Sequence, residues 1–132
     1  MEKNGVESFS SGRWEFLDMR MWMVPTSILC KQHLLGEHLE THMFVGSINK
    51  QLKMDGYVKN NCLEIKSLLK RHDDLAIELE RRGMKHNSPL PVIKDITYLK
   101  EEIIMYTIDK DKSLKELLNR CTQCKERFNY EN

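Results

Sequence analysis

The fold is decided by one long stretch, residues 28–53, which reads ILCKQHLLGEHLETHMFVGSINKQLK. Its apolar residues recur at helical spacing, so the stretch predicts one long amphipathic helix. The expected apolar face consists of Leu35, Leu39, Met43 and Ile48, flanked by Leu34, Val45 and Leu52. Thr26 or Ser27 supplies the N-cap. Gly36 and Gly46 lie inside the helix, where each costs about 1 kcal/mol relative to alanine, which suggests close packing or close approach of a ligand at those turns.

Further helices follow along the chain. A second helix is expected over residues 62–82, with Gly83 as its stop, and a third over residues 110–120. The apolar positions of the second helix are Leu68, Leu69, Leu75, Ile77 and Leu79. A short helix or turn is expected over 97–105, and residues 19–24 predict a short strand or a buried extended segment. With three main helices and no internal repeat, the fold class is all-α.

Composition places the chain among single globular domains. It has 132 residues, of which 40% are hydrophobic and 31% charged, so we expect one globular domain. Residues 1–13 contain three serines and two glycines and show no periodicity, so they are expected to form a flexible tail. No apolar run approaches the ~18 residues of a membrane span, and no signal-peptide pattern opens the chain. A cytoplasmic protein with reduced thiols is therefore expected. Net charge is +1, although residues 50–71 form a mildly basic segment that is either a phosphate contact or a solvated helix face.

Two groups of residues have the spacing of functional sites. His38 and His42 are one helical turn apart, as in a metal-dependent hydrolase, but no Glu directly follows the first His, as zincins require. A carboxylate of Glu37 or Glu40 could act as a general acid or base, and the alternative is a polar helix face. The second group is the pair Cys121 and Cys124. Because a structural zinc site needs a second pair and Cys30 and Cys62 stand alone, we expect incidental thiols rather than a zinc site of four cysteines.

The segment from Met19 to Met23, followed by Gln32-His33-Leu34 and by Glu37 to Glu40, resembles the N-terminus of pyrimidine-dimer DNA glycosylases of the phage endonuclease V type. Leu69-Lys70-Arg71 and Arg82-Gly83 resemble that family's second long helix, so the resemblance covers about residues 19–90. It implies a compact domain whose N-terminal arm threads between three helices. It also implies a DNA repair glycosylase with AP lyase activity, acting as a monomer on double-stranded DNA that contains damaged pyrimidines, with no cofactor, metal or membrane.

The resemblance also assigns roles to residues. Met19 corresponds to the residue whose α-amine forms a Schiff base, and Glu40 to the catalytic carboxylate. Arg20 and His33 correspond to residues beside the DNA. Leu39 and Met43 stand where the family has basic residues, so we expect the remaining DNA contacts to come from His38, His42, Lys70 and Arg71.

An internal Met19 has no α-amine. The resemblance therefore divides the chain into a flexible extension over 1–18 and one helical domain over 19–132. One resolution is that the start is misassigned and that the mature chain begins at Met19. The alternative is a DNA-binding module of the same fold without catalytic activity.

Overall fold

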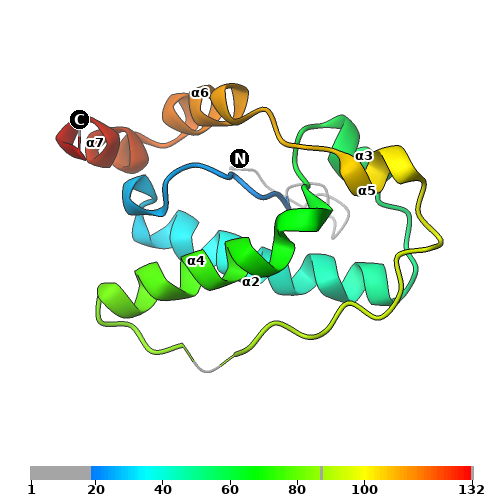
Figure 1. The fold of residues 1–132 in the computed structure, drawn as a ribbon. Coiled ribbons are helices and arrows are strands. Elements are labelled where there is room, and N and C mark those ends of the chain that lie inside the picture. Colours follow the sequence, from blue (N-terminus) through cyan, green and yellow to red (C-terminus); the bar gives the residue numbers. More distant parts are fainter. Residues whose placement is uncertain (1–18, 87, 132) are drawn as a thin grey trace, which may run out of the picture.

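The structure is a computed structural model that describes residues 19–86 and 88–131, and over these residues it contains helices and no strand (Figure 1). The elements are η1 (Thr26–Ile28), α2 (Lys31–Asn49), α3 (Asp55–Lys59), η2 (Ile65–Ser67), α4 (Leu68–Arg81), α5 (Glu101–Met105), α6 (Lys110–Arg120) and α7 (Thr122–Glu131). The all-α prediction is confirmed. The expected extension over 1–18 lies outside the described residues.

The predicted helices differ from the observed ones mainly at their ends. The first begins at Lys31 because Cys30 caps it, and it ends at Asn49 because Gln51 has a left-handed backbone, with φ 60°. The second begins only at Leu68, since residues 62–64 are not helical and Ile65–Ser67 forms the separate helix η2. The third, α6, has the predicted bounds. Helices α3 and α7 were not predicted.

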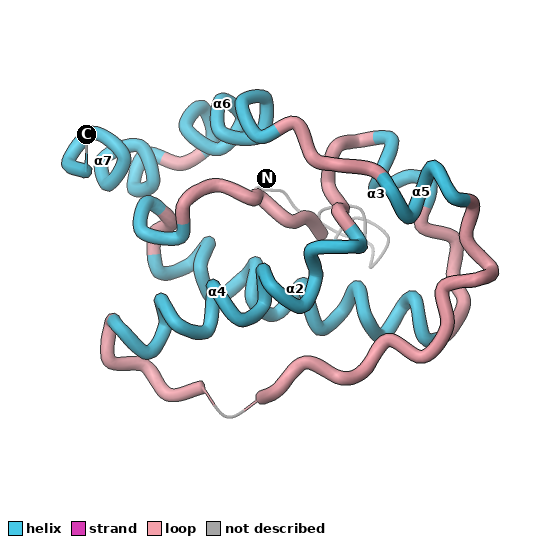
Figure 2. The backbone as a smooth tube through the Cα atoms, in the orientation of Figure 1, coloured by secondary structure: helices cyan, strands magenta, loops and turns pink. Residues whose placement is uncertain are grey.

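Residues 19–24 join the helices to one another (Figure 2). The backbone N–H of Met21 donates to the Cys62 carbonyl at 2.7 Å, and Ser113 Oγ of α6 donates to the Trp22 carbonyl at 2.5 Å. Side chains of the segment enter two separate hydrophobic clusters: Met19 and Met21 one, Trp22 and Val24 the other. This segment is therefore largely buried and is not a strand, but it is not extended throughout, because Met23 has a left-handed backbone with φ 57°.

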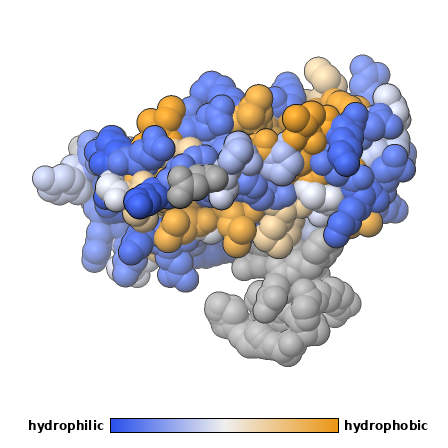
Figure 3. All heavy atoms as spheres, turned by 90° about the horizontal axis from the view of Figure 1, so that it is seen from below, coloured by the Kyte–Doolittle hydropathy of each residue, from blue (hydrophilic) through white to orange (hydrophobic). Residues whose placement is uncertain are grey.

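The buried face of α2 is not the predicted one. Leu35, Leu39 and Met43 are 42%, 59% and 42% exposed, whereas the helix buries Leu34, Glu37, Thr41, Phe44, Val45 and Ile48. Both sets have helical spacing, so periodicity could not separate them. Apolar side chains consequently remain on the surface, as Figure 3 shows for the face seen from below.

The glycines of α2 do not mark close packing. A Cβ atom built on Gly36 or Gly46 would meet nothing within 4 Å. The expectation of close packing at these turns is therefore wrong. No helix among the described residues is both long enough and apolar enough to cross a membrane.

A buried ion pair joins α2 to α4. Arg71 donates to both carboxylate oxygens of Glu37, from Nε at 2.6 Å and from Nη2 at 3.0 Å. Its third nitrogen, Nη1, donates to the Val24 carbonyl at 2.8 Å. Because both side chains are almost fully buried, each charge depends on the other for compensation.

Removing one partner of this pair should lower the stability of the fold far more than removing both. We expect Glu37→Leu or Arg71→Met to lower the free energy of unfolding by about 3–5 kcal/mol, because the remaining charge is buried without compensation. The double variant should recover most of that loss. Urea denaturation of the four proteins measures the coupling energy, and additive losses would contradict this account.

Candidate functional site

The start of the described chain lies against Glu40 of α2. The backbone N–H of Arg20 donates to Glu40 Oε1 at 2.8 Å. The nitrogen of Met19 is three covalent bonds away from that donor, so it lies within roughly 4 Å of it. Glu40 is half-buried and the Met19 side chain is buried. The structure therefore brings together the two residues predicted to be catalytic.

Arg20 is held inside the protein. Its guanidinium lies 3.8 Å from the centroid of the Trp22 ring. Nη2 donates to Ser113 Oγ at 3.3 Å, and Nη1 is 3.5 Å from Glu116 Oε2. Only 5% of the residue is exposed, and its buried Nε has no hydrogen-bond partner among the described residues. These contacts hold residues 19–20 in place, and the burial of the guanidinium does not support the predicted position of Arg20 beside the DNA.

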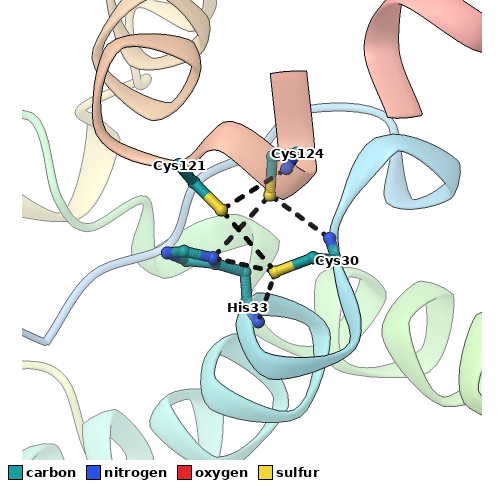
Figure 4. Close-up of side chains that lie close together, drawn as sticks. All are labelled: Cys30, His33, Cys121 and Cys124. Atoms are coloured by element: carbon teal, nitrogen blue, oxygen red, sulfur yellow. Dashed lines mark hydrogen bonds between the residues drawn. The ribbon is translucent and has the colours of Figure 1, made fainter. Parts of the chain in front are cut away.

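His33 lies near this group but faces sulfur atoms. Its ring is 5.8 Å from the Trp22 ring, edge to face. Its Nδ1 is 3.2 Å from Cys30 Sγ and 3.7 Å from Cys124 Sγ. Figure 4 shows His33 and Cys30 from α2 and the turn before it, opposite Cys121 and Cys124. The hydrogen bond from the Cys124 thiol, supported by His33, lowers the pKa of Cys30 from 9.0 to about 3.

His38 and His42 lie on a different side of α2 from Glu40. Each is two positions away from it, which is about 200° around the helix. Both belong to a group with His72 of α4 and His86, whose ring centroids are 4.7–5.2 Å apart. Burial, and then the neighbouring histidines, lower the pKa of His38 from 6.5 to about 4, and the pKa of His42 is also lowered.

Lys70 and Arg71 are adjacent in sequence but not in environment. Lys70 is exposed and pairs with Asp74 at 2.8 Å. Arg71 is instead buried against Glu37, an environment that does not support its predicted DNA contact. Glu37 is likewise occupied by this ion pair, so of the two candidate carboxylates only Glu40 lies outside it.

Two groups of side chains could hold a metal ion. In each group the ligand atoms lie within 4.8 Å of one another, among the residues that the structure describes. One contains His38, His42 and His72, and the other contains Cys30, His33, Cys121 and Cys124. Sequence reasoning found the pairs His38/His42 and Cys121/Cys124 but missed His72, His86 and the link from Cys121 to Cys30. The one available signal was Cys30-x-x-His33, which has the same spacing as Cys121-x-x-Cys124.

Acid should destabilise the fold through His38. Above pH 6.5 this residue is neutral in both folded and unfolded chains. Between pH 6.5 and about 4 the unfolded chain binds a proton that the folded chain does not, so stability is lost as pH falls. We expect His38→Gln to reduce the loss of unfolding free energy between pH 7 and pH 5, a range in which ordinary carboxylates stay ionised. Urea denaturation at both pH values checks this, and an unchanged difference would contradict it.

The sequence model of the family described as pyrimidine dimer DNA glycosylase matches residues 19–92, more than half of the chain. No curated protein and no solved structure gives a match. The chain therefore belongs to the pyrimidine dimer DNA glycosylase family.

Proposed function

We propose that this member of the family is a DNA glycosylase with AP lyase activity, which excises pyrimidine dimers or related damaged bases. The nucleophile is the α-amine of Met19 in a chain that begins at that residue. The main support is the 2.8 Å hydrogen bond from Arg20 N to Glu40 Oε1, because it holds the start of the segment against a carboxylate. The family match also begins at Met19.

An α-amine suits this chemistry because its pKa of about 7.7–8.0 leaves a useful neutral fraction at physiological pH. The neutral nitrogen attacks C1′ of the damaged nucleotide, and the glycosidic bond from C1′ to the base breaks. The bond between C1′ and O4′ then opens, O4′ takes up a proton, and C1′ remains as an imine on the Met19 nitrogen. Loss of a proton from C2′ breaks the bond from C3′ to its phosphate oxygen, which cuts the strand.

Glu40 provides the negative charge that stabilises the sugar cation, and it is the group that transfers protons in this scheme. Its carboxylate stabilises the cationic sugar as the base leaves, and it carries protons during ring opening and elimination. Arg20 acts as a positioning residue, since its backbone and guanidinium tie the segment to α2 and α6. DNA then approaches α2 beside Glu40, where Leu39 and Met43 are exposed. A damaged pyrimidine pair is poorly stacked, which lowers the cost of extruding a base.

Glu40→Gln should abolish catalysis without disturbing the fold. The amide keeps an oxygen that can accept from Arg20 N but loses the negative charge. We expect base release and strand cleavage to fall by about 10²-fold or more, with DNA binding retained. Gel assays on an oligonucleotide with one cyclobutane dimer measure both activities, and Glu80→Gln, at an exposed position of α4, is the matched control. Cleavage near the wild-type rate would remove Glu40 from the mechanism.

The position of the amine can be tested by changing where the chain begins. A chain that begins at Met19 should be trapped on abasic DNA by borohydride, and reductive methylation near neutral pH should abolish trapping while most lysines stay protonated. The chain that begins at Met1 should be much slower, since its α-amine is eighteen residues away from Met19. Equal trapping of the two chains would place the nucleophile elsewhere, for instance at Lys31 or Lys50.

Two alternatives remain as competing functions. A DNA-binding module without catalytic activity would bind abasic DNA but would not be trapped by borohydride. A metal-dependent hydrolase is favoured by one observation, the convergence of His38, His42 and His72. His42→Gln separates this function from the proposed one. His42 is predicted as a DNA contact but lies on a different side of α2 from Glu40, so its loss should slow Schiff-base cleavage only a few-fold, whereas it would inactivate a hydrolase that uses His42 as a ligand.

A further inference from the structure

We propose that Cys30, His33, Cys121 and Cys124 form a structural zinc site that fastens the C-terminal helices to the start of α2. This inference does not depend on the proposed glycosylase chemistry. It departs from the sequence-based expectation of incidental thiols, and its ligands differ from the four cysteines weighed there, because His33 takes the place of Cys62.

The distances between the side chains fit a tetrahedral ion. With Zn–S bonds of about 2.3 Å and Zn–N bonds of about 2.0–2.1 Å, a tetrahedron has edges of about 3.8 Å between sulfurs and about 3.6 Å between sulfur and nitrogen. The Sγ atoms of Cys30 and Cys121 are 3.8 Å apart, and His33 Nδ1 is 3.7 Å from Cys124 Sγ. The contact from His33 to Cys30 Sγ is shorter, at 3.2 Å. The four side chains converge on one point in Figure 4.

The backbone around the four ligands is built in two matching halves. Cys30 caps α2, and its Sγ accepts the backbone N–H of His33 at 3.4 Å. Cys121 precedes α7 in the same way, and its Sγ accepts the backbone N–H of Cys124 at 3.4 Å. The third sulfur, of Cys124, accepts the backbone N–H of Cys30 at 3.2 Å. Each sulfur therefore has a hydrogen-bond donor, which is how outer contacts orient and stabilise thiolate ligands.

Positive charge lies beside the site. Three thiolates, one neutral imidazole and Zn²⁺ together carry a net charge of −1. Arg82 donates to the carbonyl of Leu29, next to Cys30, at 2.8 Å, and Arg127 donates to the carbonyl of Ser27 at 2.9 Å. The N-termini of α2 and α7 add their positive dipole ends. Arg82 also pairs with Glu78 at 2.8 Å, so Arg127 and the two helix N-termini are the groups that can offset the net negative charge of an occupied site.

The donor set points to zinc and to a structural role. Mixed thiolate and imidazole ligands in a tetrahedron are typical of zinc, and a site whose four positions are all filled by protein has no place for a reacting water. Cys62 lies outside the group, since its thiol donates to the Asn60 carbonyl at 3.3 Å. Helix α7 is the element that such a site would fasten: among its described residues only Cys124 is fully buried, with Phe128 partly buried against the same hydrophobic cluster.

Metal analysis of the full chain tests the proposal. We expect the purified protein to contain zinc, and the double variant Cys121→Ser/Cys124→Ser to contain one equivalent less per chain. Cys62→Ser is the matched control, because it changes a cysteine outside the site, and it should retain that equivalent. His33→Cys should also retain it, since a fourth thiolate can replace the imidazole.

Cobalt substitution gives a readout that does not depend on how the serine variant folds. Co²⁺ added to the zinc-depleted wild-type chain should produce the sulfur-to-cobalt charge-transfer band and the visible absorption of a tetrahedral site, and His33→Cys should shift that spectrum. The proposal is overturned if the wild-type chain shows no such band or if the serine variant keeps the same zinc content as wild type. It is also overturned if Cys30 and Cys121 are found as a disulfide in the purified protein.

Discussion

The buried ion pair between Arg71 and Glu37 sets the rotation of α2, and the placement of the functional side chains follows from that rotation. An unpaired charge in the interior costs several kcal/mol, so Glu37 must point toward α4. With Glu37 fixed, helical geometry turns Glu40 toward residues 19–20 and turns His38 and His42 toward His72. The same arginine also holds the Val24 carbonyl, so one side chain fixes the helix pair and the segment that lies against it.

Local sequence patterns predicted the class of the fold and the presence of its main helices, but not which side of α2 is buried. The spacing of Leu35, Leu39 and Met43 is as regular as that of Leu34, Phe44 and Ile48. What separates the two sets is the pairing of Glu37 with a residue 34 positions away, which periodicity does not contain. Helix α7 was missed for a related reason, since it buries little apolar surface and therefore shows a weak amphipathic pattern.

The candidate sites show the same division between local and long-range information. The family resemblance predicted that Met19 lies close to Glu40, and the hydrogen bond from the adjacent Arg20 N to Glu40 is consistent with that prediction. Single residues were harder to assign, because basic side chains look alike in a sequence. Arg71 reads as a DNA contact beside Lys70, yet it is buried while Lys70 is exposed. The partners of His38 and of Cys121 come from other elements and cannot be found by spacing alone.

The family match ends at residue 92, but residues beyond it also hold the Arg20 side chain in place. Ser113 of α6 bonds to both the Arg20 guanidinium and the Trp22 carbonyl, and Glu116 lies beside the same guanidinium. Cys121, one of the four proposed zinc ligands, directly follows helix α6. A metal at that site would therefore act on catalysis only at a distance, by limiting the movement of α6 against the segment that carries Met19. Glu40 would keep its own position without the metal, because the ion pair between Glu37 and Arg71 orients α2 independently.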